Sequence, residues 1–118
     1  MTRPVVVTEP GHGHRVGNVE FLARTVDTPF FNLGIVVLRP GQGVSSHVHE
    51  VEDDSFLVLE GTLSLVVGDD DRQVRADAGT FVHVPAGTAH SIANDGTDDV
   101  RLLNVHAPGG FDRRIGLR

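Results

Sequence analysis

Turn-forming residues interrupt this chain at intervals of about ten residues, and that spacing limits the possible folds more than any other feature. Between the interruptions by Gly, Pro, Asn and Asp, apolar residues either alternate with polar ones or form short runs. No segment shows convincing helical periodicity. A chain of 118 residues is long enough for one core but not for two. The sequence therefore predicts one all-β domain over residues 1–118.

The expected strands are short, and the expected loop at residues 11–17 separates the first two of them. They cover residues 5–8, 19–25, 30–39, 44–49, 55–60, 62–67, 73–76, 81–84, 88–93 and 100–106. Since no helix is available to cover the sheet edges, a closed barrel or a double-sheet jelly roll is expected. Residues 35–38 and 56–59 are apolar on both faces of their strands. A second copy would cover the outer face, so we expect a symmetric homodimer.

Composition excludes several kinds of chemistry and of partner. The chain has no cysteine, so it has no disulfide, thiolate ligand or thiol nucleophile. It has no tyrosine, and all its basic residues are arginine, which excludes phenolic acid catalysis and Schiff-base chemistry. The net charge is −6 and the only basic patch is in the C-terminal tail, so nucleic acid is not an expected partner. No apolar run resembles a membrane span or a signal peptide, which predicts a cytoplasmic protein with no membrane partner.

Residues 41–61 contain the donor atoms of a possible metal site. The order is Gly41, five residues, His47, one residue, His49, four residues, Asp54, six residues, Gly61. Residues two apart on a β-strand point to the same side, so both imidazoles would face one spot. Two imidazoles with a nearby carboxylate suit a transition metal.

A second spaced motif follows between residues 79 and 94. Its order is Gly79, five residues, Pro85, one residue, Gly87, two residues, His90, three residues, Asn94. Together, the two motifs resemble the two conserved motifs of the cupin superfamily over about residues 20–111. The ending LLNVHAPGGFDRRI is similar to that of small, single-domain quercetinase-like cupins.

The resemblance implies a double-stranded β-helix, which is a jelly-roll barrel, with one divalent transition metal in its mouth. The implied ligands are His47, His49, Asp54 and His90. Imidazole suits Fe, Mn, Ni, Zn and Cu alike, so the ligands do not select the metal. Asp54 stands where the family has glutamate and is shorter by about 1.5 Å. It would bind after an inward shift of its strand, bind through a water, or lie outside a three-histidine site.

Four further histidines have two interpretations each. His106 and His83 lie in apolar strands, which is unusual for histidine without a partner. Facing the interior, His106 would be a general base near the metal; otherwise either histidine lies at the barrel rim or a dimer interface. His12 and His14 are expected to be an exposed loop pair, with a lid or a second metal site as the alternative.

The remaining polar residues are expected to have structural roles. Glu52 and Asp53 are predicted to be solvated loop acids, and Asn94 to be a turn residue. The acids at 69–71 and 95–99 are predicted to lie in hairpin turns. The barrel lining, forming core first and an apolar pocket second, is expected to include Phe56, Val58, Leu65, Val82, Ile92 and Leu102.

The resemblance favours a metal-dependent enzyme, either dioxygenase-like or cyclase/isomerase-like, acting on a small and largely neutral organic ligand. Acids beside the site disfavour phosphate substrates, and cupin classes that use lysine, tyrosine or cysteine are excluded by composition. One alternative is a non-catalytic binding or sensor protein. Another is a stable barrel in which the change to Asp54 has weakened the metal site.

Overall fold

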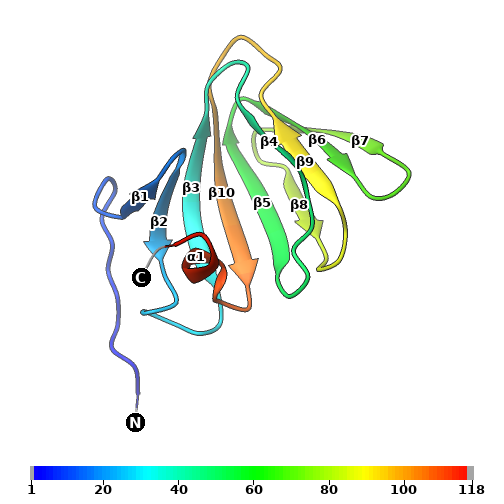
Figure 1. Cartoon of the computed structure of the whole chain (residues 1–118). Helices are drawn as coiled ribbons and strands as arrows, with labels where there is room; N and C mark the ends of the chain where they lie inside the picture. The colour runs from blue at the N-terminus through cyan, green and yellow to red at the C-terminus, as the bar shows by residue number, and fades with distance from the viewer. Residues whose placement is uncertain (1, 117–118) are drawn as a thin grey trace.

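The computed structural model describes residues 2–116, and Figure 1 shows that nearly all of its regular structure is β-strand. One sheet has six strands in the order β1-β2-β3-β10-β5-β8. Its strands are β1 (His14–Val16), β2 (Val19–Ala23), β3 (Asn32–Leu38), β10 (Val100–Ala107), β5 (Asp53–Glu60) and β8 (Phe81–Val84). The fold is therefore all-β, as the turn spacing predicts.

The second sheet has four strands in the order β4-β9-β6-β7. They are β4 (Gly43–His47), β9 (His90–Ala93), β6 (Thr62–Val67) and β7 (Arg72–Asp77). Every strand pair in both sheets is antiparallel. This two-sheet antiparallel arrangement is the predicted jelly roll.

The core lies between the two sheets, where side chains alternate in and out along each strand. On β3, for example, Val36 and Leu38 are buried while Val37 between them is exposed. Five of the six predicted lining residues are buried in this core, and Val82 is partly buried against it. The core comprises Val36, Leu38, Phe56, Val58, Leu63, Leu65, Ala76, Val84, Ile92, Val100 and Leu102.

The turns connect neighbouring strands where the sequence places them. The acids at 69–71 and 95–99 lie in the β6–β7 and β9–β10 connections. Gly61 turns β5 into β6 with φ +78°, and a Cβ there would lie 2.6 Å from the Asp99 carbonyl oxygen. Only glycine fits so close an approach.

Three predictions about the chain ends are wrong. Residues 5–8 form no strand, since they have no backbone ladder with another described strand. The expected loop at 11–17 contains β1, whose His14–Val16 pairs with β2. A helix, α1 (Phe111–Arg114), follows the last strand. Its four residues make about one turn, too few to show helical periodicity in a sequence.

Contacts with the six-stranded sheet hold α1 in place, beside β2 and β3 in Figure 1. The buried Asp112 carboxylate accepts hydrogen bonds from the backbone N–H of Thr25, at 2.9 Å, and from its hydroxyl. The Asp112 backbone N–H donates to Asn32 Oδ1 at 3.0 Å. Within residues 2–116, no helix is long and apolar enough to cross a membrane.

Candidate metal centre

The structure gathers the four predicted ligands from both sheets. His47 ends β4 and pairs in register with His90, the first residue of β9, while Asp54 lies near the start of β5. His49 lies just beyond β4, not within a strand over 44–49 as predicted. One donor atom from each of the four residues can be chosen so that all four lie within 4.8 Å of one another. The chain therefore has a His-His-Asp-His group that could bind a metal.

The geometry of this group fits a single ion. Two ligands at about 2.0–2.2 Å from an ion can be no more than about 4.4 Å apart, so the group needs to contract by a few tenths of an ångström. Nε2 of His49 is buried and has no hydrogen-bond partner among the described residues. A buried nitrogen without a partner is costly unless it binds something. Imidazole and carboxylate donors are those that Zn, Fe, Ni, Cu and Mn accept.

Backbone carbonyls orient two of the three imidazoles. Nδ1 of His47 lies 2.8 Å from the Ser45 carbonyl oxygen, and Nδ1 of His90 lies 3.0 Å from that of Thr88. A carbonyl only accepts hydrogen bonds, so each Nδ1 carries the proton. Nε2 of each ring is then available at the centre, as metal ligation requires.

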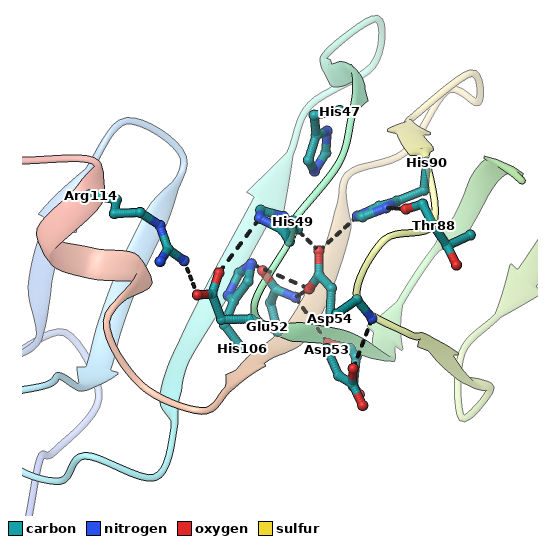
Figure 2. A network of polar contacts seen from close by, with 12 residues as sticks. His47, His49, Glu52, Asp53, Asp54, Thr88, His90, His106 and Arg114 are labelled. Carbon is teal, nitrogen blue, oxygen red and sulfur yellow. Dashed lines mark hydrogen bonds and ion pairs between the residues drawn. The ribbon is translucent and has the colours of Figure 1, made fainter.

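Asp54 lies at the middle of the polar network in Figure 2. It is 2% exposed, and its Oδ2 lies 2.8 Å from Nε2 of His90 and 3.3 Å from Nε2 of His49. Its Oδ1 accepts a hydrogen bond of 2.6 Å from the Asn104 amide and lies 3.4 Å from Nε2 of His106. Without a metal, the positive charge near this carboxylate comes from protons on the imidazoles.

Burial and pairing shift the pKa values of three groups in different directions. Burial alone would raise the pKa of Asp54, but hydrogen bonds from His106, His49 and His90 outweigh it and hold that pKa far below its usual range. Burial opposes charging of His90, but its bonds to Asp54 and the Thr88 carbonyl raise its pKa. The pKa of His47 is lowered, mainly by burial and further by the neighbouring His90 and His49. The metal-free centre thus favours an ionised Asp54 paired with a protonated His90.

His106 faces the interior and not the rim or a dimer interface. It is 5% exposed, and its ring stacks on Phe111 of α1 with centroids 3.8 Å apart and planes 8° from parallel. Asn104 points to the same side from two residues earlier on β10 and also donates to Asp54. Sequence analysis missed Asn104, although the two-residue period of a strand placed it beside His106. It also missed Phe111, which has no comparable local signal.

The other histidines lie outside the centre. His83 is on the outer face of the six-stranded sheet, where Nε2 lies 3.2 Å from Asp53 Oδ2 and Nδ1 lies 2.9 Å from the Ser55 hydroxyl. This is the rim-like position that the sequence allowed. His12 and His14 are exposed, as expected, although His14 begins β1.

Glu52 corrects the prediction of a solvated loop acid. Its exposed fraction is 0%, and it forms an ion pair with Arg114 of α1. Its Oε1 lies 3.9 Å from Nδ1 of His49 (Figure 2). Arg114 is about sixty positions away along the chain, so no local pattern indicated this burial. Asp53 is half-exposed, but it accepts a 2.8 Å hydrogen bond from the Ala86 N–H and pairs with His83.

The centre opens onto a cavity of about 470 Å³ between the sheets. His47, His49 and Asp54 form part of its wall, with Asn104 and His106 beside them. Its lining includes no arginine among the described residues. Most of the remaining wall is apolar, and includes Val19, Phe21, Val36, Leu38, Ile92 and Phe111. Phe56 also lines it, whereas the predicted Val58, Leu65 and Leu102 lie in the packed core.

Comparison with protein families places the chain. The model of the cupin domain matches residues 34–106, which is more than half of the chain. The chain belongs to the cupin family. A solved cupin-like neighbour, the TT1209 protein of Thermus thermophilus, has a TM-score of 0.72 at 24% identity and covers 90% of this chain and 100% of its own. That likeness shows the double-stranded β-helix fold alone.

Two curated proteins are similar in sequence. Quercetin 2,3-dioxygenase of Bacillus subtilis (strain 168) is 29% identical over 111 residues, covering 90% of this chain and 32% of the relative. The tetracenomycin polyketide synthase protein TcmJ of Streptomyces glaucescens is 34% identical over 76 residues, covering 64% of this chain and 50% of the relative. The cupin chain thus spans no more than half the length of these relatives.

Proposed function

We propose that this cupin is a metal-dependent enzyme that acts on a small, largely neutral organic molecule. One divalent transition metal would be held by His47, His49, Asp54 and His90. The observation that carries this proposal is that the donor group forms part of the wall of the 470 Å³ cavity. A metal there would meet any molecule that enters. The cavity also argues against a barrel filled by its own side chains, which a metal-site relic would resemble.

Asp54 is proposed to bind directly, because its Oδ2 already lies among the imidazole nitrogens. When bound, the ion would supply Lewis acidity toward a substrate oxygen. His106 is the proposed proton acceptor, since its Nε2 lies 3.4 Å from Asp54 Oδ1 and it lines the cavity. Asn104 donates to both Asp54 and the Ser55 carbonyl, which holds the carboxylate in place.

The cavity lining supports a neutral substrate. A carboxylate or phosphate would find no arginine among the described lining residues, whereas an apolar body would find aliphatic and aromatic walls. The likeness to quercetin 2,3-dioxygenase favours oxygenase chemistry, and the likeness to a polyketide synthase protein favours cyclisation of a related oxygen-rich substrate. Both reaction types remain within the proposal.

The test combines metal content with turnover. The purified protein is reconstituted in turn with Fe, Mn, Ni, Zn and Cu, and oxygen uptake and product mass are measured with flavonol, diketone and polyketide panels. We expect turnover with at least one metal, and loss of turnover with retained metal in His106→Asn. His83→Asn, on the outer face, is the matched control. Ligand binding without turnover would support the non-catalytic sensor alternative, and absence of metal binding would overturn the proposal.

We also propose that the chain forms a homodimer through the outer face of the six-stranded sheet. Val37, Leu59 and Phe81 are 38%, 37% and 62% exposed on this face. A second copy would bury both apolar faces at once, which a symmetric contact achieves with one surface. Sedimentation velocity should show a dimer, and Val37→Asp should shift it to a monomer. Val5→Asp, in the exposed N-terminal arm, should not.

A further inference from the structure

The two nitrogens of the His49 ring face two different carboxylates (Figure 2). Nε2 lies 3.3 Å from Asp54 Oδ2 in the metal centre, and Nδ1 lies 3.9 Å from Glu52 Oε1 on the other side. Both Glu52 oxygens are buried and neither accepts a hydrogen bond from a described residue. A buried carboxylate with unfilled acceptor positions calls for an explanation.

His49 also lacks the contact that orients the other two imidazoles. His47 and His90 each direct Nδ1 at the carbonyl oxygen two residues earlier. The corresponding carbonyl contact is not found for His49 among the described residues, and Glu52 is the group that faces its Nδ1. His49 lies beyond the end of β4, so strand geometry does not supply that carbonyl.

We propose that Glu52 is a positioning residue for His49, and that Arg114 holds Glu52 in place. The Glu52 carboxylate would accept the Nδ1–H of His49, leaving Nε2 as the nitrogen that faces the metal. At 3.9 Å the contact is longer than a hydrogen bond, so the side chains must approach by about 1 Å. The inference rests on the metal site of the proposed function, which makes His49 a ligand.

Arg114 brings the C-terminal helix into this arrangement. Its guanidinium pairs with Glu52 Oε2, while its side chain remains 51% exposed. The same helix places Phe111 edge-on against His49, with ring centroids 5.2 Å apart. The bonds from Thr25 to Asp112 fix the helix to the sheet. The position of α1 and the orientation of His49 are therefore linked through Glu52.

A purely structural role, in which the ion pair only fastens α1, makes different predictions. It would leave the His49 tautomer unchanged, because fastening the helix does not require a proton acceptor at Nδ1. It would also make loss of Arg114 as harmful to metal binding as loss of Glu52. Tautomer and affinity therefore separate the two roles.

The test uses Glu52→Gln, with Asp53→Asn as the matched control in the same turn. Imidazole ¹⁵N NMR of the metal-free protein near pH 8 reports the His49 tautomer, and calorimetric titration with Ni²⁺ and Co²⁺ reports affinity. We expect His49 to be mainly Nδ1–H in the wild type, with that fraction reduced in Glu52→Gln. Metal affinity should fall roughly 10- to 100-fold. Asp53→Asn should leave both unchanged.

Arg114→Gln tests the outer member of the arrangement, with the exposed Arg113→Gln as its control. We expect a smaller loss of metal affinity than in Glu52→Gln, and no added loss when the two changes are combined, because both act through one contact. Glu52→Met removes the acceptor entirely; if it does not fold, Glu52→Gln still decides.

Wild-type tautomer and affinity in Glu52→Gln would overturn the inference. Equal losses in the Glu52 and Arg114 variants with an unchanged tautomer would also overturn it, in favour of the fastening role. If the wild type binds neither metal, the proposed function fails instead. The tautomer of the metal-free protein still tests Glu52 in that case.

Discussion

His90 and His49 reach the same centre from differently built parts of the molecule. His90 is the first residue of β9, is 2% exposed, and is oriented by the backbone carbonyl of Thr88. His49 lies in the connection after β4, and the group facing its outer nitrogen is the side chain of Glu52. A backbone carbonyl is present whatever the residue type, whereas a side-chain partner exists only in the right sequence.

This difference separates a rigid side of the site from an adjustable one. On the side of His47 and His90, paired strands set the ligand positions. On the side of His49, the positions depend on a connection, a buried ion pair and a four-residue helix. Segments outside the strand ladders open at lower free-energy cost than the strands do. Changes in the helix should therefore affect His49 before they affect His90.

The largest expected effect is on the rigid side. His90→Ala should reduce metal affinity by more than about 100-fold, because removing a ligand costs more than removing the group that orients it. Calorimetric titration with Ni²⁺ measures the loss, and His83→Ala on the outer face is the control. Comparable affinities for wild type and His90→Ala would show that the paired strands do not supply a ligand.

A second prediction uses the opposite pKa shifts of Asp54 and His90 in the metal-free protein. The pKa of Asp54 is depressed in the folded state, so its contribution is present above the unfolded value of about 4 and is lost as the pH falls. The pKa of His90 is raised, so its contribution is present below about 6.5 and is lost as the pH rises through the folded value.

The free energy of unfolding of the metal-free protein should therefore decrease both below about pH 4 and above about pH 6.5. Urea denaturation with chelator, from pH 3 to pH 9, measures it. In His90→Gln the decrease at high pH should be smaller. An unchanged high-pH slope in this variant would assign that decrease to other groups.

A smaller effect is expected from the adjustable side. Phe111→Ala removes the ring that stacks on His106 and touches His49, and should lower the free energy of unfolding by about 1–3 kcal/mol, less than for a fully buried ring. Metal affinity should fall less than in His90→Ala. Thermal unfolding and Ni²⁺ titration check both, with the exposed Phe30→Ala as control. A loss of affinity equal to that of His90→Ala would remove the distinction between the two sides.

The smallest effect is expected where the backbone does the orienting. Thr88→Ala and Ser45→Ala delete side chains but keep the carbonyls that bond to His90 and His47. Metal affinity should stay within about twofold, which is below the roughly 10-fold minimum expected for losing an orienting group. A tenfold loss in either variant would mean that the side chains, and not the carbonyls, orient these rings.

Most of the fold and the four-residue group could be predicted from the sequence. The spacing of Gly, Pro, Asn and Asp predicts short strands, and two spaced motifs predict His47, His49, Asp54 and His90 as one group. These features are local, because strand alternation and tight turns depend on neighbouring residues. The same alternation predicted the buried positions of β3 and β5.

Other features depended on segments that are distant in the chain. Residues 5–8 have strand-forming side chains but find no partner strand, whereas the loop before β2 does. His106 had two possible positions until the pairing of β10 with β3 and β5 directed it inward. A strand exists only when another backbone pairs with it, so β-propensity alone does not decide it.

Glu52 shows most clearly where the sequence stops. From the sequence it is one acid among several in a turn, and the chain determined only that it lies near His49. The tertiary structure decided that it is buried, because α1 brings Arg114 against it from the other end of the domain. Burial is the sum of contacts from every element that covers a residue, and a residue's neighbours in sequence do not contain that sum. The ligand types therefore came from the sequence, and the group that holds His49 came from the fold.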